Sequence, residues 1–306
     1  MGLIHCPFGI PYYDCVGCID CGMCLATTKE QMIEASKIVR EHLRSQQKDG
    51  GVTTKIAVCG KGGVGKSTIV ALLAEVLLGE GYSIMVMDTD ESNSGLTRLC
   101  GFDGEPAPLM DLLRQVPQGQ SGPDVEWLRK DRIAFEDIPA EYMVERGQFK
   151  FLMVGKIEDP FQGCACTMAD ITRDLVGRLD TKEKEIVVID TEAGVESFGR
   201  GVERSVDTVL VIVEPSFQSI DLAGRIHYMA RGMGISRVRT ILNKVASAQS
   251  EQKMIDELGK KEIAVTGTIG LDNEISEAGF EGRALGGESR AKNDMKQMLK
   301  TLLQES

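Results

Sequence analysis

The segment from Gly60 to Ser67 has the composition and spacing of a phosphate-binding loop. It reads GKGGVGKS, which matches the pattern G-x-x-x-x-G-K-[ST], and it joins an apolar run to a run that is typical of a helix. Glycines let backbone N–H groups turn toward phosphate oxygens, and the helix presents its positive dipole end to the same anion. We therefore expect ATP or ADP to bind here with Mg²⁺. The residues expected to contact the nucleotide are Gly60, Gly62, Gly63, Val64, Gly65, Lys66, Ser67 and Thr68.

Side chains in and after this loop suit a triphosphate with its magnesium ion. Lys66 is expected to pair with the β- and γ-phosphates, and the Ser67 hydroxyl to coordinate Mg²⁺. Two later apolar runs end in aspartate, since SIMVM is followed by Asp88 and Asp90, and EIVVI by Asp190. Carboxylate oxygens are ligands that Mg²⁺ prefers. A strand-end aspartate is also a common turn or cap residue, but two of them after a phosphate loop favour a shared role.

Five cysteines lie in the first 24 residues, a segment too short to form a hydrophobic core without a metal. Three of them, Cys15, Cys18 and Cys21, have the ferredoxin spacing for three corners of a 4Fe–4S cluster. The fourth ligand is either Cys6, which precedes a proline, or Cys24, which is nearer in sequence. A Cys₄ zinc site is the alternative, because zinc also binds paired C-x₂-C motifs. We predict a small iron–sulfur module.

A second group of cysteines, Cys164 and Cys166, lies in GCACT before a run that is typical of a helix. Two thiolates do not complete a tetrahedral site on one ion, whereas two pairs that face each other across a symmetric dimer do. Thiolate ligands suit Zn²⁺, Cu(I) or Ni²⁺, and the sequence does not choose among them. The alternative is that both are small buried residues beside the helix. We predict a metal site shared by two copies of the chain.

The elements that must position these residues alternate between strands and helices. Buried parallel strands are predicted for the apolar runs KIAVC, SIMVMD, FKFLMV, EIVVID, TVLVIV and VRTILNKV. The first two, with the loop and a helix between them, form a βαβ unit. Between Gly101 and Gln148 the periodicity is weak, and only LMDLLRQ is expected to be helical. We expect an α/β fold with a doubly wound, mostly parallel sheet in residues 51–306, preceded by the cysteine-rich module and a linker helix in residues 1–50.

Composition restricts the partners and the compartment. The chain has 306 residues, of which 42% are hydrophobic, enough for a sizeable core. Its net charge of −11 disfavours nucleic acid and anionic membranes as partners. One face of the C-terminal helix carries Met295, Met298 and Leu302, and we expect it to pack on the sheet because it lacks the Trp and Phe of membrane-binding helices. No signal peptide or long apolar span is recognisable, so we expect a cytoplasmic protein.

The loop contains a second lysine, Lys61, which the basic motif does not require. In this it resembles the deviant Walker A loop of the SIMIBI ATPases, the group that includes the nitrogenase iron protein and the division-site-selection ATPases. The resemblance implies that Lys61 crosses a dimer interface to the partner's nucleotide. It also implies that Asp90 orients the attacking water and that Asp190 holds the Mg²⁺ shell. Asn243, in ILNK, would face the adenine ring, and Glu214 would lie in a base-side loop.

Longer motifs narrow the resemblance to the CooC-type ATPases, nickel-handling maturation factors of carbon monoxide dehydrogenase. These motifs are CGKGGVGKST, DTDES, FLMVGKIEDPFQGCACT, VVIDTEAGVESFGRG, VEPSFQSID and ILNKV. The resemblance implies a slow, switch-type ATPase that forms a homodimer, holds Ni²⁺ or Zn²⁺ at Cys164 and Cys166, and delivers nickel to carbon monoxide dehydrogenase or a related metalloenzyme. It does not cover the N-terminal cysteines. The alternative function is an ATP-gated electron donor similar to the nitrogenase iron protein; a partition-type or membrane-positioning ATPase is the third.

Overall fold

The computed structural model describes most of the chain after residue 53, and Gln31 before it. The five N-terminal cysteines, Cys164, and all of the predicted linker helix except Gln31 lie outside the described residues. For residues 113–114 and 165–170 the backbone alone is described. The described ranges are 54–90, 95–114, 125–156, 165–195, 205–235 and 237–303.

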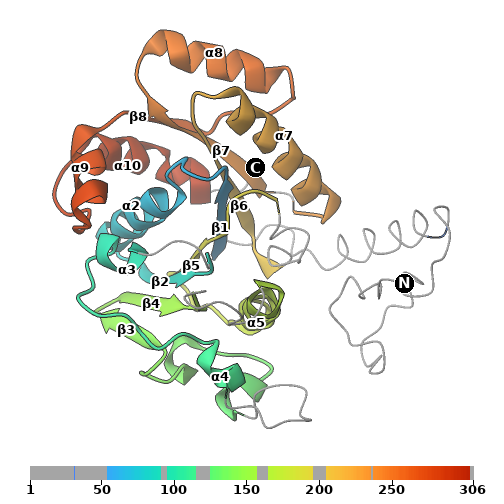
Figure 1. Cartoon of the computed structure of the whole chain (residues 1–306), viewed down its shortest axis with the longest axis vertical. Helices are drawn as coiled ribbons and strands as arrows, with labels where there is room; N and C mark the ends of the chain where they lie inside the picture. The colour runs from blue at the N-terminus through green and yellow to red at the C-terminus, as the bar shows by residue number, and fades with distance from the viewer. Residues whose placement is uncertain are drawn as a thin grey trace.

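One sheet of eight strands runs through the described part of the chain, in the order β3-β4-β2-β5-β1-β6-β7-β8 (Figure 1). Every neighbouring pair is parallel except β3 and β4, which are antiparallel. The strands are β1 (Lys55–Gly60), β2 (Ser83–Asp88), β3 (Met143–Arg146), β4 (Phe149–Met153), β5 (Glu185–Asp190), β6 (Thr208–Val213), β7 (Arg237–Val245) and β8 (Gly267–Gly270). The predicted α/β fold with a mostly parallel sheet is thereby confirmed.

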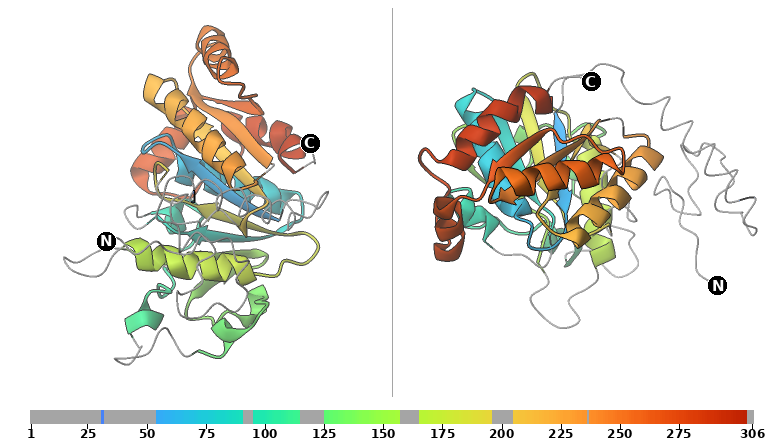
Figure 2. Two further views of the ribbon diagram at one scale, coloured as in Figure 1. Left: turned by 90° about the vertical axis from the view of Figure 1, so that its right-hand side faces the viewer. Right: turned by 90° about the horizontal axis from the view of Figure 1, so that it is seen from above.

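Helices cover both faces of this sheet (Figure 2). Two of the longer ones begin at serine caps: the side chains of Ser216 and Ser247 each accept a hydrogen bond from the backbone N–H three residues later. The α-helices are α2 (Lys66–Gly79), α3 (Leu96–Leu99), α4 (Asp111–Arg114), α5 (Ala165–Arg178), α7 (Phe217–Gly232), α8 (Ala248–Gly259), α9 (Asn273–Glu281) and α10 (Arg290–Leu303), and the short 3₁₀ helices are η2 (Trp127–Arg129) and η3 (Phe135–Asp137).

Two hydrophobic clusters fill the space between the sheet and its helical layers. Alternate residues of β1 point to opposite faces: Ala57 and Cys59 belong to the cluster under α5, α7 and α8, whereas Ile56 and Val58 belong to the cluster under α2, α9 and α10. Because both faces are covered, β5 and β6 are buried along their whole length. This double burial explains why their sequences are uninterrupted apolar runs.

The six predicted strands are present, but the sequence analysis does not anticipate β3 or β8. The stretch from Gly101 to Gln148 is accordingly less irregular than expected, because it contributes β3, η2 and η3 in addition to the predicted helix, found as α4. Half of β3 consists of the exposed charged residues Glu145 and Arg146. In β8 two of the four residues are glycine. Neither composition is typical of a strand.

The C-terminal helix α10 packs on the fold, as predicted. Met295, Met298 and Leu302 are buried, and α10 contacts β8 and α2. Among the described residues, no helix is both long and apolar enough to cross a membrane.

The carboxyl ends of the parallel strands meet at one edge of the sheet. Gly60 ends β1 in the centre of the sheet, and Asp88 and Asp190 end β2 and β5 as partners in the same register. On the other side of β1, the ends of β6 and β7 lie side by side. In open α/β sheets, ligands bind outside this edge. The topology therefore brings the predicted loop and both aspartates to one place.

Candidate functional site

The phosphate loop joins β1 to α2 and has the backbone that an anion site needs. Gly63 and Gly65 are left-handed, with φ of 81° and 93°. Close contacts also require glycine: a Cβ on Gly60 would lie 2.7 Å from the carbonyl oxygen of Ile212, and one on Gly65 would lie 2.8 Å from Nδ2 of Asn243. The loop thus lies against the ends of β6 and β7, at the N-terminus of a 14-residue helix. The dipole of that helix favours a phosphate group here.

Asp190, at the end of β5, is completely buried. Its Oδ2 accepts a 2.6 Å hydrogen bond from the Ser67 hydroxyl, whereas its Oδ1 has no hydrogen-bond partner among the described residues. Burial raises the pKa of Asp190 to about 7; the negative charge of Asp88 adds to the rise, while Ser67 and Lys66 oppose it. A buried carboxylate oxygen without a partner is unfavourable, so the position fits a cation.

Ser67 and Asp190 have the donor atoms for the Mg²⁺ that accompanies a nucleotide. One hydroxyl and one carboxylate suffice as protein ligands, because Mg²⁺ keeps several waters and takes other oxygens from the phosphates. When bound, the ion would supply positive charge that offsets the charge of the phosphate oxygens. The side chain of Lys66 is also buried, at the first turn of the same helix. The residues at the start of α2 therefore fit both the phosphates and the metal.

A second buried carboxylate, Asp88, lies beside Asp190 at the end of β2. Lys156 donates a 2.7 Å hydrogen bond to Oδ2 of Asp88, and its ammonium also donates to the backbone carbonyl of Asp90. The backbone N–H of Asp90 donates to Oδ1 of Asp88 at 3.2 Å. Burial raises the pKa of Asp88 to about 6, although Lys156 opposes the rise. Lys156 therefore fixes the segment that carries Asp90, the residue expected to orient water.

Sequence reasoning missed Lys156, and one signal could have found it. The residue lies three positions after β4, a strand that pairs with β2. A basic residue just beyond a buried strand, at the sheet edge where aspartates end other strands, is a candidate partner for their charge. Identifying it requires the strand order, which places β4 directly beside β2.

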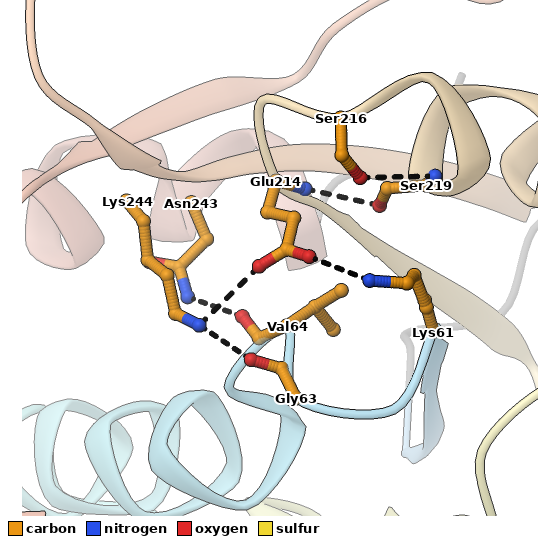
Figure 3. Close-up of polar contacts among 8 residues, drawn as sticks. All are labelled: Lys61, Gly63, Val64, Glu214, Ser216, Ser219, Asn243 and Lys244. Atoms are coloured by element: carbon orange, nitrogen blue, oxygen red, sulfur yellow. Dashed lines mark hydrogen bonds and ion pairs between the residues drawn. The ribbon is translucent and has the colours of Figure 1, made fainter.

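The base-side loop after β6 is tied to the phosphate loop by charged side chains (Figure 3). Oε1 of Glu214 lies 3.0 Å from Nζ of Lys61, and Oε2 lies 3.3 Å from Nζ of Lys244. Partial burial works to raise the pKa of Glu214, but hydrogen bonds from both lysines outweigh it and hold the pKa below its usual range. Glu214 and Lys61, which were predicted separately from the sequence, are thus direct partners.

Asn243 is buried, and its amide is directed at the phosphate loop. Its Nδ2 donates a 2.8 Å hydrogen bond to the carbonyl oxygen of Val64. The next residue, Lys244, donates to the carbonyl oxygen of Gly63. The structure places Asn243 where the sequence expects a nucleotide, and its contact with adenine stays a prediction.

The predicted soft-metal and iron–sulfur sites are not tested by the described residues. Cys166 lies in the first turn of α5, where the backbone alone is described, and Cys164 lies outside. Within the described ranges, no group of three or more His, Cys, Asp or Glu side chains could hold a metal ion. The described cysteines Cys59 and Cys100 are buried, and neither forms a disulfide among the described residues.

Comparison with known proteins agrees with this geometry. The CobQ/CobB/MinD/ParA nucleotide binding domain matches residues 55–285. An uncharacterised ATP-binding protein of Methanocaldococcus jannaschii is 36% identical over 80% of this chain and 99% of its own length. The carbon monoxide dehydrogenase accessory protein CooC of Rhodospirillum rubrum is 34% identical over 73% of this chain and 86% of its own length. The structure of the septum site-determining protein MinD of Pyrococcus horikoshii with Mg-ADP covers 82% of this chain and 96% of its own, with a TM-score of 0.60 at 16% identity.

The similarity to MinD shows a shared fold only, because the sequence identity is 16%. The domain match and the two relatives are similar to this chain in sequence over most of its length. The matched region begins at β1 and includes the phosphate loop, both strand-end aspartates, Glu214 and Asn243. We therefore expect the chain to bind ATP with Mg²⁺ and to hydrolyse ATP. The chain belongs to the CobQ/CobB/MinD/ParA family of nucleotide-binding P-loop ATPases.

Proposed function

We propose that this chain is an ATP-dependent maturation factor that delivers nickel to carbon monoxide dehydrogenase or a related metalloenzyme. The observation that carries the ATPase part is the buried, unpartnered Oδ1 of Asp190 next to Ser67 and the phosphate loop. Support for the metal-handling part comes from the similarity to CooC, whose name describes an accessory protein of carbon monoxide dehydrogenase.

In the proposed cycle, nucleotide binding controls whether two copies associate. Lys66 and the N–H groups of the loop bind the phosphates, and Asp90 orients the attacking water. Lys61 leaves Glu214 and reaches the nucleotide of the partner subunit. Because each nucleotide is then contacted by both copies, ATP favours the dimer and hydrolysis loosens it. Slow turnover suits such a switch, since the dimer must last long enough to hold its cargo.

Two cysteine sites complete the proposal. Cys164 and Cys166 of two copies face each other and hold one Ni²⁺ or Zn²⁺ ion through four thiolates. Residues 1–50 form an iron–sulfur module, and residues 51–306 form the ATPase domain. The cluster ligands are Cys15, Cys18, Cys21 and either Cys6 or Cys24.

Anaerobic nickel titration of the full chain tests this function, after its iron content has been measured. We expect one Ni²⁺ per two chains, bound more tightly with a non-hydrolysable ATP analogue, because linkage between two ligands is reciprocal. The variants Cys164→Ser and Cys166→Ser should lose this ion and still bind nucleotide.

Asp190→Asn is the matched control for the titration. It keeps both cysteines but removes the carboxylate of the nucleotide site, so nickel should still bind without responding to the analogue. One ion per single chain, insensitive to the cysteine variants and to nucleotide, would contradict nickel delivery. An N-terminal cluster whose charge state cycles with nucleotide would instead favour the ATP-gated electron donor.

A further inference from the structure

The end of β7 has an unusual backbone where it passes the phosphate loop. Lys244 has φ of 58°, in the left-handed region that lysine seldom adopts. The pairing of β7 with β8 shifts its register between Leu242 and Val245, on either side of this residue. Such conformations persist where their surroundings impose them, and they cluster at functional sites. The contacts around Lys244 should therefore include those that impose this backbone conformation.

Two consecutive residues of β7 hold two consecutive carbonyl groups of the loop (Figure 3). Nζ of Lys244 donates to the carbonyl oxygen of Gly63, and Nδ2 of Asn243 donates to that of Val64 at 2.8 Å. A regular strand places successive side chains on opposite faces. The left-handed turn at Lys244 lets both side chains reach the loop.

These contacts fix the direction of the loop's N–H groups. In a planar trans peptide the N–H points away from the C=O of the same unit. When the carbonyls of Gly63 and Val64 are held toward β7, the N–H groups of Val64 and Gly65 are directed away from it. The backbone N–H of Val64 accordingly donates to the carbonyl oxygen of Lys61 within the loop, with 3.3 Å between nitrogen and oxygen. The orientation of its N–H groups is what makes a glycine-rich loop a phosphate site.

The position of the Lys244 ammonium is itself fixed by Glu214. The carboxylate lies between Lys61 and Lys244 and contacts both, so that two cations approach the same loop without unbalanced repulsion. The backbone N–H of Glu214 donates to the hydroxyl of Ser219 at 3.1 Å, and the N–H of Ser219 donates to the Ser216 cap. Glu214 is thus anchored at the N-terminus of α7.

We propose that Lys244 is a positioning residue for nucleotide binding. Together with Asn243 it holds the Gly63–Gly65 backbone in the phosphate-binding conformation before the nucleotide arrives, and its left-handed backbone is imposed by that task. The inference depends on nucleotide binding at the loop and not on the metal that the chain handles. Failure of the nickel experiment would leave it intact.

Lys244→Gly separates this role from a purely structural one, because glycine adopts the left-handed conformation without strain but lacks the side chain. The matched control is Lys184→Gly: Lys184 is exposed, has φ of 63°, and precedes β5 on the way out of α5. Both variants should retain or raise the melting temperature of the full chain. Calorimetric titration with Mg·ADP should show an affinity about tenfold weaker for Lys244→Gly, no change for Lys184→Gly, and recovery for Lys244→Arg.

Hydrogen exchange of the nucleotide-free protein gives a second measurement. Amides of residues 60–68 should exchange faster in Lys244→Gly than in Lys184→Gly, because the carbonyls are released. With saturating ATP, kcat should stay within about twofold while KM rises, since a positioned loop mainly improves binding.

Three results would each overturn the proposal. One is wild-type affinity for Mg·ADP in Lys244→Gly. Another is weakened affinity with unchanged exchange of the loop, which would mean that Lys244 contacts the nucleotide directly. The third is an arginine variant that binds no better than the glycine variant.

Discussion

Asp88 shows how strongly one buried residue at this site depends on its partner. Its side chain is 3% exposed, and it is paired with Lys156, which is 14% exposed. Lys156→Met leaves a buried carboxylate without its counter-charge, so we expect the free energy of unfolding to fall by about 3 kcal/mol. Urea denaturation at pH 7 measures this change. Asp88→Asn in the same chain should recover part of the loss, because the charge is then removed from both sides.

Lys150→Met is the control for that experiment. Lys150 is also largely buried, but its partner Glu145 is 59% exposed. Loss of such a pair costs under about 1 kcal/mol. If Lys156→Met were no more destabilising than Lys150→Met, the stabilising role of the Lys156–Asp88 pair would be refuted.

His227, on α7, gives the chain a stability that depends on pH. Its Nε2 lies 2.7 Å from the Thr240 hydroxyl, and its Nδ1 is buried without a hydrogen-bond partner in the described structure. Burial lowers the pKa of His227 to about 4, and the charge of Arg231 contributes. The folded state therefore binds the proton less readily than the unfolded chain, whose histidine titrates near 6.5.

The difference between the pKa of His227 in the folded and in the unfolded chain sets the direction in which pH changes the stability. Above pH 6.5 the stabilising contribution is complete, and it is lost progressively as pH falls from 6.5 to 4, by up to about 1.4 kcal/mol per unit. His227→Gln removes this titrating group, so the stability of the variant relative to the unsubstituted chain should rise as pH falls from 6.5 to 4; Asp88 and Asp190, whose raised pKa values act in the opposite direction in both proteins, cancel in this comparison. Denaturation series at pH 7, 5.5 and 4.5 compare the two proteins. A difference in stability between the two proteins that stays constant with pH would show that His227 does not titrate as expected.

At the scale of elements, the sequence predicts the central strands well and the sheet's edges poorly. The apolar runs of β5 and β6 come from burial on both faces, so hydrophobicity alone identifies them. The edge strands β3 and β8 form because β4 and β7 offer them backbone partners. Their own residues give no comparable signal, since β3 ends in exposed charges and β8 is half glycine.

The candidate site likewise has features that the sequence predicts and features that it does not. The phosphate loop and the strand-end aspartates are local patterns, and the structure places them together as expected. The contacts of Glu214 with Lys61 and Lys244 join segments that are distant in sequence. They depend on the order β1-β6-β7 and on one left-handed residue. Neither condition can be derived from the composition of those segments.

Helix α10 offers a prediction at the same scale, because its apolar face is part of the core. Met295 is fully buried there. Met295→Ala removes buried methylene groups and leaves a cavity, so we expect a loss of about 3 kcal/mol of unfolding free energy. Lys300→Ala, on the exposed side of the same helix, should change it by less than about 0.5 kcal/mol. Equal effects in chemical denaturation would argue against α10 as a core element.

At the scale of the whole molecule, one ion pair connects the nucleotide site to the proposed dimer. In the proposed dimer Lys61 reaches the partner's nucleotide, yet in the single chain its ammonium lies 3.0 Å from Glu214 of the same chain, with 37% of its side chain exposed. Dimerisation through Lys61 must therefore break this pair. Since a partly exposed pair contributes at most about 1 kcal/mol, the pair tunes the association without preventing it.

Substitutions of Lys61 and of Glu214 should change the strength of dimerisation in opposite directions. Lys61→Ala should abolish or strongly weaken dimerisation by a non-hydrolysable ATP analogue while each chain still binds nucleotide, because Lys66 is expected to contact the phosphates within the same chain. Glu214→Gln releases Lys61 in both copies, so at a saturating concentration of the analogue it should tighten the dimer by up to about 30-fold, because two pairs of at most about 1 kcal/mol each no longer have to be broken. Saturation is needed because Glu214 also holds Lys244. Lys182→Ala breaks an exposed pair with Glu136 elsewhere on the surface and should change nothing. Sedimentation velocity over a concentration series measures all three, and an unchanged dimer in Lys61→Ala would eliminate the role of this lysine between subunits.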